Sequence, residues 1–394
     1  MRRIGFVTPW YGENIPGGAE MELRGIVKHL VDKNVEIEVL TTCVRDSLSD
    51  WNEDYHKEGL EVVGGIRVRR FPVRKRNALE FEAVNYKLIH HLRVTEEEEY
   101  SFFREMVNSP KLYEYMKLHQ EAYDLFVFIP YLFGTTYYGM QICPEKSVLI
   151  SCFHDEGYVY MKCLKKVVER IRGIIFLSKP EQQLANKIFN LSGVQQGVLG
   201  AGVDSDYIGQ AIAFREKYKL EAPFIVYAGR KAEGKNVHLL IQYFLEYKKW
   251  NHNELKLLLI GGGTIEIPKS GKEDIIDLGF VPIQDKFDAY AAAQLLCQPS
   301  QNESFSLVIM ESWLCGRPVL VHEKCEVTKT FATEAQGGLY FNDYYDFEGC
   351  INFFLEHYDI AEKMGQNGKK YVEDNFLWDA IKAKLLSFFE ACIR

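Results

Sequence analysis

Two glutamates flank a turn whose spacing suits anion and sugar chemistry. Glu303 and Glu311 are separated by seven residues. The apolar run from Gln294 to Ser300 predicts a buried strand, and the periodicity from Leu307 to Cys315 predicts a helix. Backbone N–H groups at a helix start are unpaired and partially positive, so phosphate binds there. A carboxylate in the same turn would face something else, such as sugar hydroxyls. The simpler interpretation is that Glu303 caps the helix and Glu311 is solvated.

Two cations follow another predicted strand. Phe224 to Tyr227 has the pattern of a strand, and Val237 to Tyr247 has the pattern of a helix, with Arg230 and Lys235 between them. In open α/β sheets, ligands bind at the carboxyl ends of the strands. Arginine offers a planar fork and lysine a point charge, so the pair suits a diphosphate.

Glycines follow two further predicted strands. Gly261–Gly263 follows Leu257–Ile260, and Gly17–Gly18 follows the N-terminal strand. Glycine lets the backbone approach a ligand closely, although Gly17–Gly18 could also be only a tight turn. Because no long helix follows Gly263, a dinucleotide-binding GxGxxG site is not expected.

Together these motifs resemble glycosyltransferase family 4. The resemblance covers nearly the whole chain, and its motifs stand in the family's order: Gly17–Gly18–Ala19–Glu20, His154, Arg230 with Lys235, and Glu303 through Glu311. It implies the α/β GT-B fold, with two Rossmann-like doubly wound parallel-sheet domains facing a cleft. It also implies a C-terminal helix that returns to the first domain, and a retaining enzyme that uses nucleotide-diphosphate sugars.

The resemblance also implies roles for single residues. The two cations and the backbone N–H groups from Ser304 to Leu307 would hold the diphosphate, while Glu311 would bind the ribose and Glu303 the transferred sugar. His154 would contact the donor sugar or the attacking hydroxyl, with a purely structural histidine as the alternative. The expected catalytic residues are Glu303, His154, Arg230 and Lys235, and the expected donor-binding residues are Gly17, Gly18, Gly261, Phe280, Ser304, Phe305, Ser306, Leu307 and Glu311.

The chain departs from the family's pattern in places. Ser304 stands where the family usually has glycine, and its Cβ would narrow the approach of the phosphate. Gly200–Ala201 replaces the usual Pro–Asn. Asp204–Ser205–Asp206 has the form of a metal-binding Asp-x-Asp, but it lies at the expected domain junction. We expect no metal and no cofactor, because Arg230 and Lys235 would neutralise the diphosphate instead.

Length and composition set further limits. A chain of 394 residues with 47% hydrophobic and 26% charged residues predicts two domains of a soluble protein. The net charge of −8 argues against nucleic-acid binding. The nine cysteines show no metal-site spacing, as expected of reduced thiols in a cytosol. We expect no signal peptide, no membrane span and a cytoplasmic protein.

Alternation of strand and helix patterns predicts the domain limits. We expect an N-terminal domain at 1–205, a nucleotide-sugar-binding domain at 206–375 and a returning helix at 376–394. Residues 61–73 predict a strand pair around Gly64–Gly65, and residues 96–120 a helical region. Six bases within Arg67–Arg76 could contact the inner face of a membrane or a lipid-linked acceptor. A solvated face is the alternative.

The expected function is therefore transfer of a hexose-type sugar from a UDP- or GDP-sugar to a sugar hydroxyl of a glycan or glycolipid, in surface polysaccharide assembly. Two other classes stay open. A non-catalytic nucleotide-sugar sensor would keep the second-domain site without needing His154, and a sugar-nucleotide epimerase shares the two-domain fold without the Glu303-to-Glu311 pattern.

Overall fold

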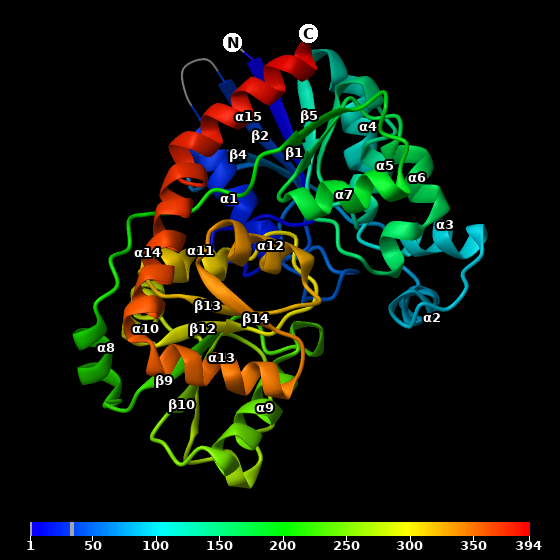
Figure 1. The fold of residues 1–394 in the computed structure, drawn as a ribbon. Helices are drawn as coiled ribbons and strands as arrows, with labels where there is room; N and C mark the ends of the chain where they lie inside the picture. Colours follow the sequence, from blue (N-terminus) through cyan, green and yellow to red (C-terminus); the bar gives the residue numbers. More distant parts are fainter. Residues whose placement is uncertain (1, 32–34) are drawn as a thin grey trace. The chain divides into compact units, whose positions relative to one another are not determined.

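The structure is a computed structural model that describes residues 2–31 and 35–394. The chain forms two compact units. The first unit comprises Met1–Gly202 together with Ile381–Arg394, and the second comprises Val203–Ala380. Each unit is an α/β domain built on its own sheet (Figure 1). The sequence-based domain limits remain predictions.

The sheet of the first unit has the strand order β3-β4-β2-β1-β5-β6-β7-β8. Neighbouring strands run parallel except for the antiparallel pair β3 and β4. The central strands are short and apolar, and they are buried along their whole length, as expected of a parallel sheet covered on both faces. The strands are β1 (Arg2–Val7), β2 (Val35–Thr42), β3 (Gly59–Val63), β4 (Ile66–Phe71), β5 (Leu125–Phe128), β6 (Ser147–Ile150), β7 (Gly173–Phe176) and β8 (Gln195–Val198).

Helices of the first unit bury their apolar faces against this sheet, in a core rich in phenylalanine that includes Phe102, Phe126 and Phe128. The helices are α1 (Gly18–Leu30), α2 (Ala78–Ile89), α3 (Glu96–Glu105), α4 (Pro110–His119), α5 (Gly134–Gly139), α6 (Lys162–Val168) and α7 (Lys179–Ile188). The expected helical region at 96–120 is thus two helices, α3 and α4. The second begins at Pro110, which has no N–H to continue a helix but suits a first turn.

The last helix, α15 (Trp378–Ile393), joins the first unit from Ile381 onward, as expected of a returning C-terminal helix. Phe389 packs edge-on against Phe6 of β1, with ring centroids 6.5 Å apart. The guanidinium of Arg172 donates to the carbonyl oxygen of Cys392 at 2.6 Å. Both termini lie at the same end of this unit (Figure 1), where Arg2 and Glu390 form an ion pair at 3.3 Å.

The sheet of the second unit is entirely parallel, with the strand order β11-β10-β9-β12-β13-β14. Its strands are β9 (Phe224–Ala228), β10 (Lys256–Ile260), β11 (Ile275–Gly279), β12 (Leu295–Gln298), β13 (Val319–His322) and β14 (Gly338–Phe341). Its helices are α8 (Ala211–Tyr218), α9 (Val237–Trp250), α10 (Ile283–Ala292), α11 (Leu307–Leu314), α12 (Glu326–Glu334), α13 (Tyr344–Glu356) and α14 (Tyr358–Asn375). Only a single 3-10 turn, Lys269–Gly271, follows Gly261–Gly263 before β11, so the expected absence of a helix there is correct.

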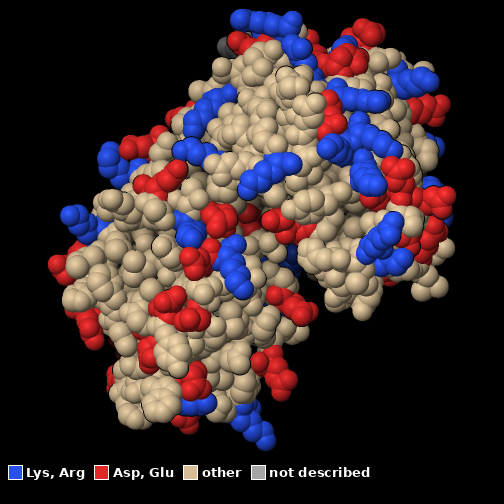
Figure 2. Space-filling view, turned by 45° about the vertical axis from the view of Figure 1, so that its right-hand side comes forward, with Lys and Arg blue, Asp and Glu red and all other residues tan. Residues whose placement is uncertain are grey.

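Charged side chains are distributed over the surface without a dominant sign on the face drawn in Figure 2, where basic and acidic groups are interspersed. Every helix among residues 2–31 and 35–394 is too short or too polar to cross a lipid bilayer.

Candidate functional site

The second unit has a topological switch point between β9 and β12. The chain leaves β9 toward β10 on one side and leaves β12 toward β13 on the other, so the loops after these two neighbouring strands diverge at the sheet edge. Such a divergence opens a crevice at the carboxyl ends of the strands, where α/β proteins bind ligands. Arg230 and Lys235 follow β9, and Glu303 follows β12.

Lys235 and Glu303 meet at this point. Their ammonium and carboxylate groups lie 2.7 Å apart, with the lysine side chain 29% exposed and the glutamate 10% exposed. The Nε2 of Gln298 also donates to Glu303 Oε1, at 3.4 Å. Asn236 ties the same two loops together by donating to the carbonyl oxygen of Pro299 at 3.1 Å. The structure therefore brings together two predicted residues that are 68 positions apart.

Arg230 is exposed and has no ion-pair partner among the residues that the structure describes. Its carbonyl oxygen accepts a hydrogen bond from Tyr227 Oη at 2.9 Å. Burial raises the pKa of Tyr227, the Glu303 carboxylate raises it further and the Arg230 guanidinium lowers it. Both predicted charges therefore act on one buried hydroxyl at the end of β9.

Helix α11 starts after a constrained turn. Ser306, the residue before the helix, has a left-handed backbone with φ 78°, and its side chain makes no capping hydrogen bond. Phe305 is 3% exposed and packs edge-on against Phe331 and Phe376, with centroids 5.2 and 5.1 Å away. This side chain anchors the turn in the core, so only the backbone of Phe305 is available to a ligand. Leu307 opens the helix. The N–H of Ile309 already donates to the carbonyl oxygen of Ser306 at 3.2 Å, so only the N–H groups before it are left for a ligand.

Glu311 is buried and already partnered. Lys286 Nζ lies 2.7 Å from its Oε1, and Tyr290 Oη donates to its Oε2 at 3.0 Å. The simpler interpretation of the glutamate pair is therefore wrong on both counts, because Glu303 does not cap α11 and Glu311 is not solvated. Sequence reasoning missed Lys286 and Tyr290. Their spacing of four places both on one face of α10, which is a signal that could have found them.

Gly261 and Phe280 lie on loops beyond β10 and β11. A Cβ on Gly261, whose φ is 124°, would stand 2.1 Å from the carbonyl oxygen of Gly229, so this position requires glycine. Phe280 is 74% exposed, and its ring covers Gly262, where a Cβ would lie 2.5 Å from the ring. An exposed aromatic ring over a glycine backbone offers a flat apolar surface for a planar group.

The first unit carries its own group of candidate residues after β1. Gly17 precedes α1 with φ 141°, and a Cβ there would collide with Glu20 Oε2 at 1.9 Å. Glu20 Oε1 accepts a hydrogen bond from Trp10 Nε1 at 2.7 Å. Around Gly18, by contrast, the space is open to 4 Å. Gly17 is thus required by its backbone conformation, whereas Gly18 leaves room for a ligand.

His154 lies in the loop after β6. The strand ends at Ile150, and Cys152 after it has a left-handed backbone with φ 54° that no strand accommodates. His154 Nδ1 is 3.4 Å from Glu156 Oε1, which also accepts from Tyr131 Oη at 3.3 Å. The imidazole is 29% exposed, so it remains accessible to a small molecule.

Two buried carboxyl groups flank this loop. Glu181 accepts from Ser151 Oγ at 2.8 Å and from the N–H groups of Phe153 and Leu177 at 2.6 Å each. Burial nevertheless raises its pKa to about 7, and burial raises the pKa of Glu22 on α1 to about 8. Ser178 caps α7 by accepting from the N–H of Glu181, but the Glu181 carboxylate binds Leu177, Phe153 and Ser151, so there is no reciprocal capping box.

The basic cluster Arg67–Arg76 is largely occupied within the first unit. Arg70 is almost fully buried and donates to the Tyr11 carbonyl oxygen at 2.9 Å. Arg76 lies over the Trp51 ring, 4.5 Å from its centroid. Such partners reduce the charge that is free to attract an anionic surface. Four ion pairs involve the cluster: Arg67 with Glu36, Arg69 with Glu38, Arg70 with Glu61 and Arg74 with Glu105.

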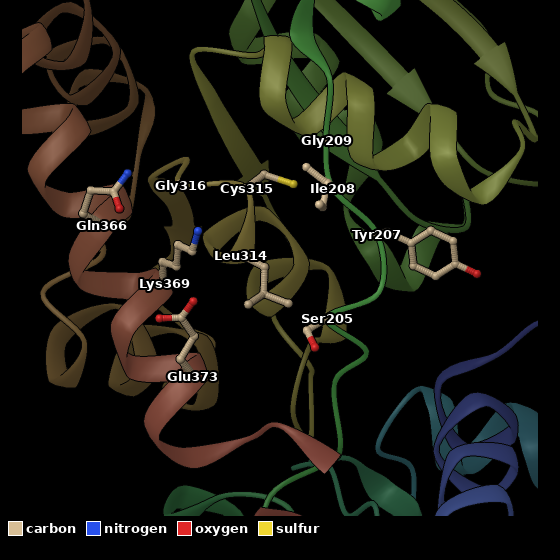
Figure 3. A pocket seen from close by; sticks show the side chains of 10 residues that line it. All are labelled: Ser205, Tyr207, Ile208, Gly209, Leu314, Cys315, Gly316, Gln366, Lys369 and Glu373. Atoms are coloured by element: carbon tan, nitrogen blue, oxygen red, sulfur yellow. The ribbon is translucent and has the colours of Figure 1, made fainter. Parts of the chain in front are cut away.

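A hollow of about 260 Å³ lies elsewhere in the second unit. Gln366, Lys369 and Glu373 of α14 face it from one side, and Cys315 at the end of α11 faces it from the other (Figure 3). Residues 205, 207–209, 314 and 316 also line it, and none of the predicted site residues does. In the described part of the chain, no three histidine, cysteine, aspartate or glutamate side chains gather as a metal site would require.

Comparison with known proteins gives a family match for part of the second unit. Residues 210–371 match the family described as glycosyl transferases group 1. The matched region lies within the second unit and contains Arg230, Lys235, Glu303 and Glu311.

Curated relatives of this chain are distant in sequence. D-inositol 3-phosphate glycosyltransferase of Corynebacterium kroppenstedtii is 27% identical over 189 residues, which are 44% of this chain and 42% of the relative. O-antigen chain mannosyltransferase B of Escherichia coli is 27% identical over 203 residues, covering 47% and 51%. The chain thus spans about half the length of the curated relatives it matches.

Solved structures match the whole chain. Sucrose-phosphate synthase from Thermosynechococcus elongatus has a TM-score of 0.73 at 17% identity, with 99% of both chains covered. HepE from Anabaena, solved in complex with UDP and glucose, has a TM-score of 0.70 at 16% identity, with 99% of this chain and 100% of HepE covered. These likenesses show that the fold is GT-B, with two parallel-sheet α/β domains.

Proposed function

We propose that this chain is a retaining glycosyltransferase of family 4. It transfers a hexose-type sugar from a UDP- or GDP-sugar to a sugar hydroxyl of a glycan or glycolipid. The group 1 match, the GT-B fold and the relatives named as glycosyltransferases support the proposal. One observation carries it: Lys235 and Glu303, from two distant motifs, meet 2.7 Å apart at the switch point of the second unit.

The donor's diphosphate binds to Arg230, Lys235 and the N–H groups that open α11. An ammonium has three N–H donors. Lys235 donates one to Glu303, so two remain for phosphate oxygens. Arg230 has its fork free for a bidentate contact. Both cations and the partially positive helix start act on the same group, which suits a diphosphate.

Bond breaking between the sugar and the phosphate builds negative charge on the leaving diphosphate. Fixed donors that face this charge stabilise the transition state more than the ground state, because the charge is larger there. Glu303 contributes in two ways. It holds Lys235 in place, and its second oxygen accepts hydrogen bonds from hydroxyls of the transferred sugar. These residues neutralise the diphosphate without a metal ion.

The acceptor hydroxyl attacks from the face that the phosphate leaves, and a phosphate oxygen takes its proton. The anomeric configuration is therefore retained, without the two carboxylates that a retaining glycoside hydrolase places on opposite faces of the sugar. His154 contacts the transferred sugar or the attacking hydroxyl. Gly17 and Gly18 are proposed to lie near the donor's phosphate or the acceptor.

The comparisons suggest which donors and acceptors to test first. UDP in the HepE structure makes a UDP-sugar the first donor to test, and GDP-sugars are the second class. Sugar hydroxyls of a surface polysaccharide or glycolipid are the proposed acceptors, at the cytoplasmic side of a membrane. Contact with the membrane through Arg67–Arg76 remains a prediction, and the ion pairs of that cluster weaken it.

The test is release of nucleoside diphosphate from a panel of UDP- and GDP-sugars, with and without oligosaccharide and glycolipid acceptors. Nuclear magnetic resonance of the product then gives the anomeric configuration. We expect acceptor-dependent release and a product that retains the donor's configuration, with full activity in a chelator. Nucleotide binding without turnover under any acceptor would favour a sensor, and an inverted product would contradict the retaining mechanism.

A further inference from the structure

A buried lysine beside the predicted diphosphate site has no role in the mechanism above. The side chain of Lys231 is 1% exposed, although it directly follows the exposed Arg230. Its Nζ lies 2.9 Å from Asp277 Oδ1 and also donates to the carbonyl oxygen of Gly261. A buried ammonium is costly unless it is paired and hydrogen-bonded, and here both conditions hold.

The contacts of Lys231 join three loops. Its backbone N–H donates to the carbonyl oxygen of Gly262 at 2.7 Å. Asp277 Oδ1 accepts a second hydrogen bond, from the N–H of Gly279 at 2.9 Å. Gly261 N–H in turn donates to the carbonyl oxygen of Gly279 at 2.8 Å. One ammonium therefore links the chain ends that leave β9, β10 and β11.

These loops carry three of the predicted site residues. Arg230 is next to Lys231 in the β9 loop, Gly261 is its direct acceptor, and Phe280 follows Gly279 in the β11 loop. The glycine loop has little tolerance for movement, because Gly261 touches Gly229 and a Cβ on Gly263 would lie 2.8 Å from the carbonyl oxygen of Lys231. Any shift of the ammonium would move the loops together.

We propose that Lys231 is a positioning residue for the nucleotide: it fixes the relative placement of Arg230, Gly261 and Phe280 and so sets the affinity for the nucleoside diphosphate. The inference rests on the proposed function, since it assumes a nucleotide at these loops. The competing explanation is that the Lys231–Asp277 pair only stabilises the second unit.

A matched ion pair at the opposite edge of the same sheet separates these explanations. Lys256, at the start of β10, lies 2.8 Å from Asp274 Oδ1 and donates to the carbonyl oxygen of Glu273 at 3.0 Å. It also pairs a lysine with an aspartate and links β10 to the segment before β11, but at the amino ends of these strands. Its side chain is 25% exposed, and Asp274 also pairs with Lys248 at 3.5 Å. Lys256→Met therefore removes a lysine–aspartate link of the same sheet, far from the predicted site.

The experiment measures binding of UDP and GDP by calorimetry to the wild type, Lys231→Met, Lys231→Arg, Asp277→Asn and Lys256→Met. Hydrogen exchange of the free proteins reports the loops at 229–235 and 259–281. In Lys231→Met we expect faster exchange in both loops and a dissociation constant raised about tenfold or more, because small misplacements of binding groups cost this much or more. Asp277→Asn should also exchange faster and bind more weakly. Lys231→Arg should bind more tightly than Lys231→Met but more weakly than the wild type. Lys256→Met should bind with the affinity of the wild type.

The outcomes separate the inference from the proposed function. If the wild type binds neither nucleotide, the proposed function fails and the inference fails with it. If the wild type binds and Lys231→Met binds equally well, only the inference is overturned, whatever the change in thermal stability. Should Lys231→Met not fold, Asp277→Asn decides the question in the same way, since asparagine keeps an acceptor for the N–H of Gly279.

Discussion

Lys286 of α10 and Glu311 of α11 form an ion pair 2.7 Å long, with both side chains largely buried. Tyr290, one turn after Lys286, donates to the other carboxylate oxygen. Glu311 therefore keeps a fixed orientation before any ligand arrives, and only its remaining lone pairs are free for ribose hydroxyls. This relationship and the Lys235–Glu303 pair lead to tests of the site.

Replacing Lys286 by methionine should weaken nucleotide binding. The change leaves the buried Glu311 without its counter-charge and frees it to rotate, so we expect the dissociation constant for UDP or GDP to rise about tenfold, the effect of about 1.4 kcal/mol. Calorimetry measures this dissociation constant.

Glu311→Gln should reduce the difference in affinity between a nucleotide and its 3′-deoxy analogue. An unchanged difference would remove Glu311 from the ribose site.

Glu303→Gln should slow turnover while leaving nucleotide affinity nearly unchanged. The amide keeps the size but loses the charge that holds Lys235, so we expect kcat to fall on the order of a hundredfold, as for other lost transition-state contacts. Steady-state kinetics with the identified donor measures this. Glu323→Gln is the matched control, since Glu323 pairs with Lys329 at 3.0 Å in the same unit, outside the predicted site. Equal effects of the two changes would argue against the role of Glu303.

Lys235→Met should lower kcat by a similar factor of about a hundred, because it removes a cation from the leaving group. The double variant Lys235→Met with Glu303→Gln should lose less than the two single losses combined, since the two residues act as one contact. A full double-mutant cycle of kcat values measures the coupling. Strict additivity would show that the ion pair has no part in turnover.

Gly17→Ala should destabilise the first unit, whereas Gly18→Ala should leave its melting temperature unchanged. Gly17 has a positive φ and its Cβ would collide with the Glu20 carboxylate, while Gly18 faces open space. Thermal unfolding followed by circular dichroism compares the variants. We expect the melting temperature of Gly17→Ala to drop by several degrees, roughly 2–4 °C per kcal/mol for a unit of about 200 residues. Equal melting temperatures would contradict the packing at Gly17.

Glu22 should make the stability of the first unit depend on pH. Its carboxyl titrates at about pH 8 in the folded protein because of burial, against 4.5 in the unfolded chain. Between these values the folded state binds more protons, so the free energy of unfolding falls as pH rises through this window. Glu22→Gln, which imitates the protonated form, should flatten the profile and melt higher than the wild type near pH 9.

A pH series of melting temperatures from 5 to 9 measures this effect, with the exposed Glu53→Gln as control. The wild type and the control should show parallel profiles, and only Glu22→Gln should differ. A Glu22→Gln profile that follows the wild type would mean that the Glu22 carboxyl is not protonated in the folded protein near neutral pH.

The sequence by itself determined the two sheets and the placement of the main motifs on them. Short apolar runs between polar turns predict buried parallel strands, and β9 was expected at Phe224 to Tyr227 and runs Phe224–Ala228 in the structure. Arg230, Lys235 and Glu303 could be assigned to strand ends for the same reason, since local periodicity defines where a strand stops.

Only the tertiary structure decided which side chains meet and which are buried. Lys231 and Arg230 are adjacent bases in the sequence, yet one is enclosed against Asp277 and the other is exposed. Lys286 and Tyr290 contact Glu311 only because α10 packs beside α11. Such contacts join residues that are distant along the chain, and local patterns carry no information about them. Backbone exceptions such as Cys152 and Ser306 likewise depend on the surrounding packing, which holds a conformation that their own side chains disfavour.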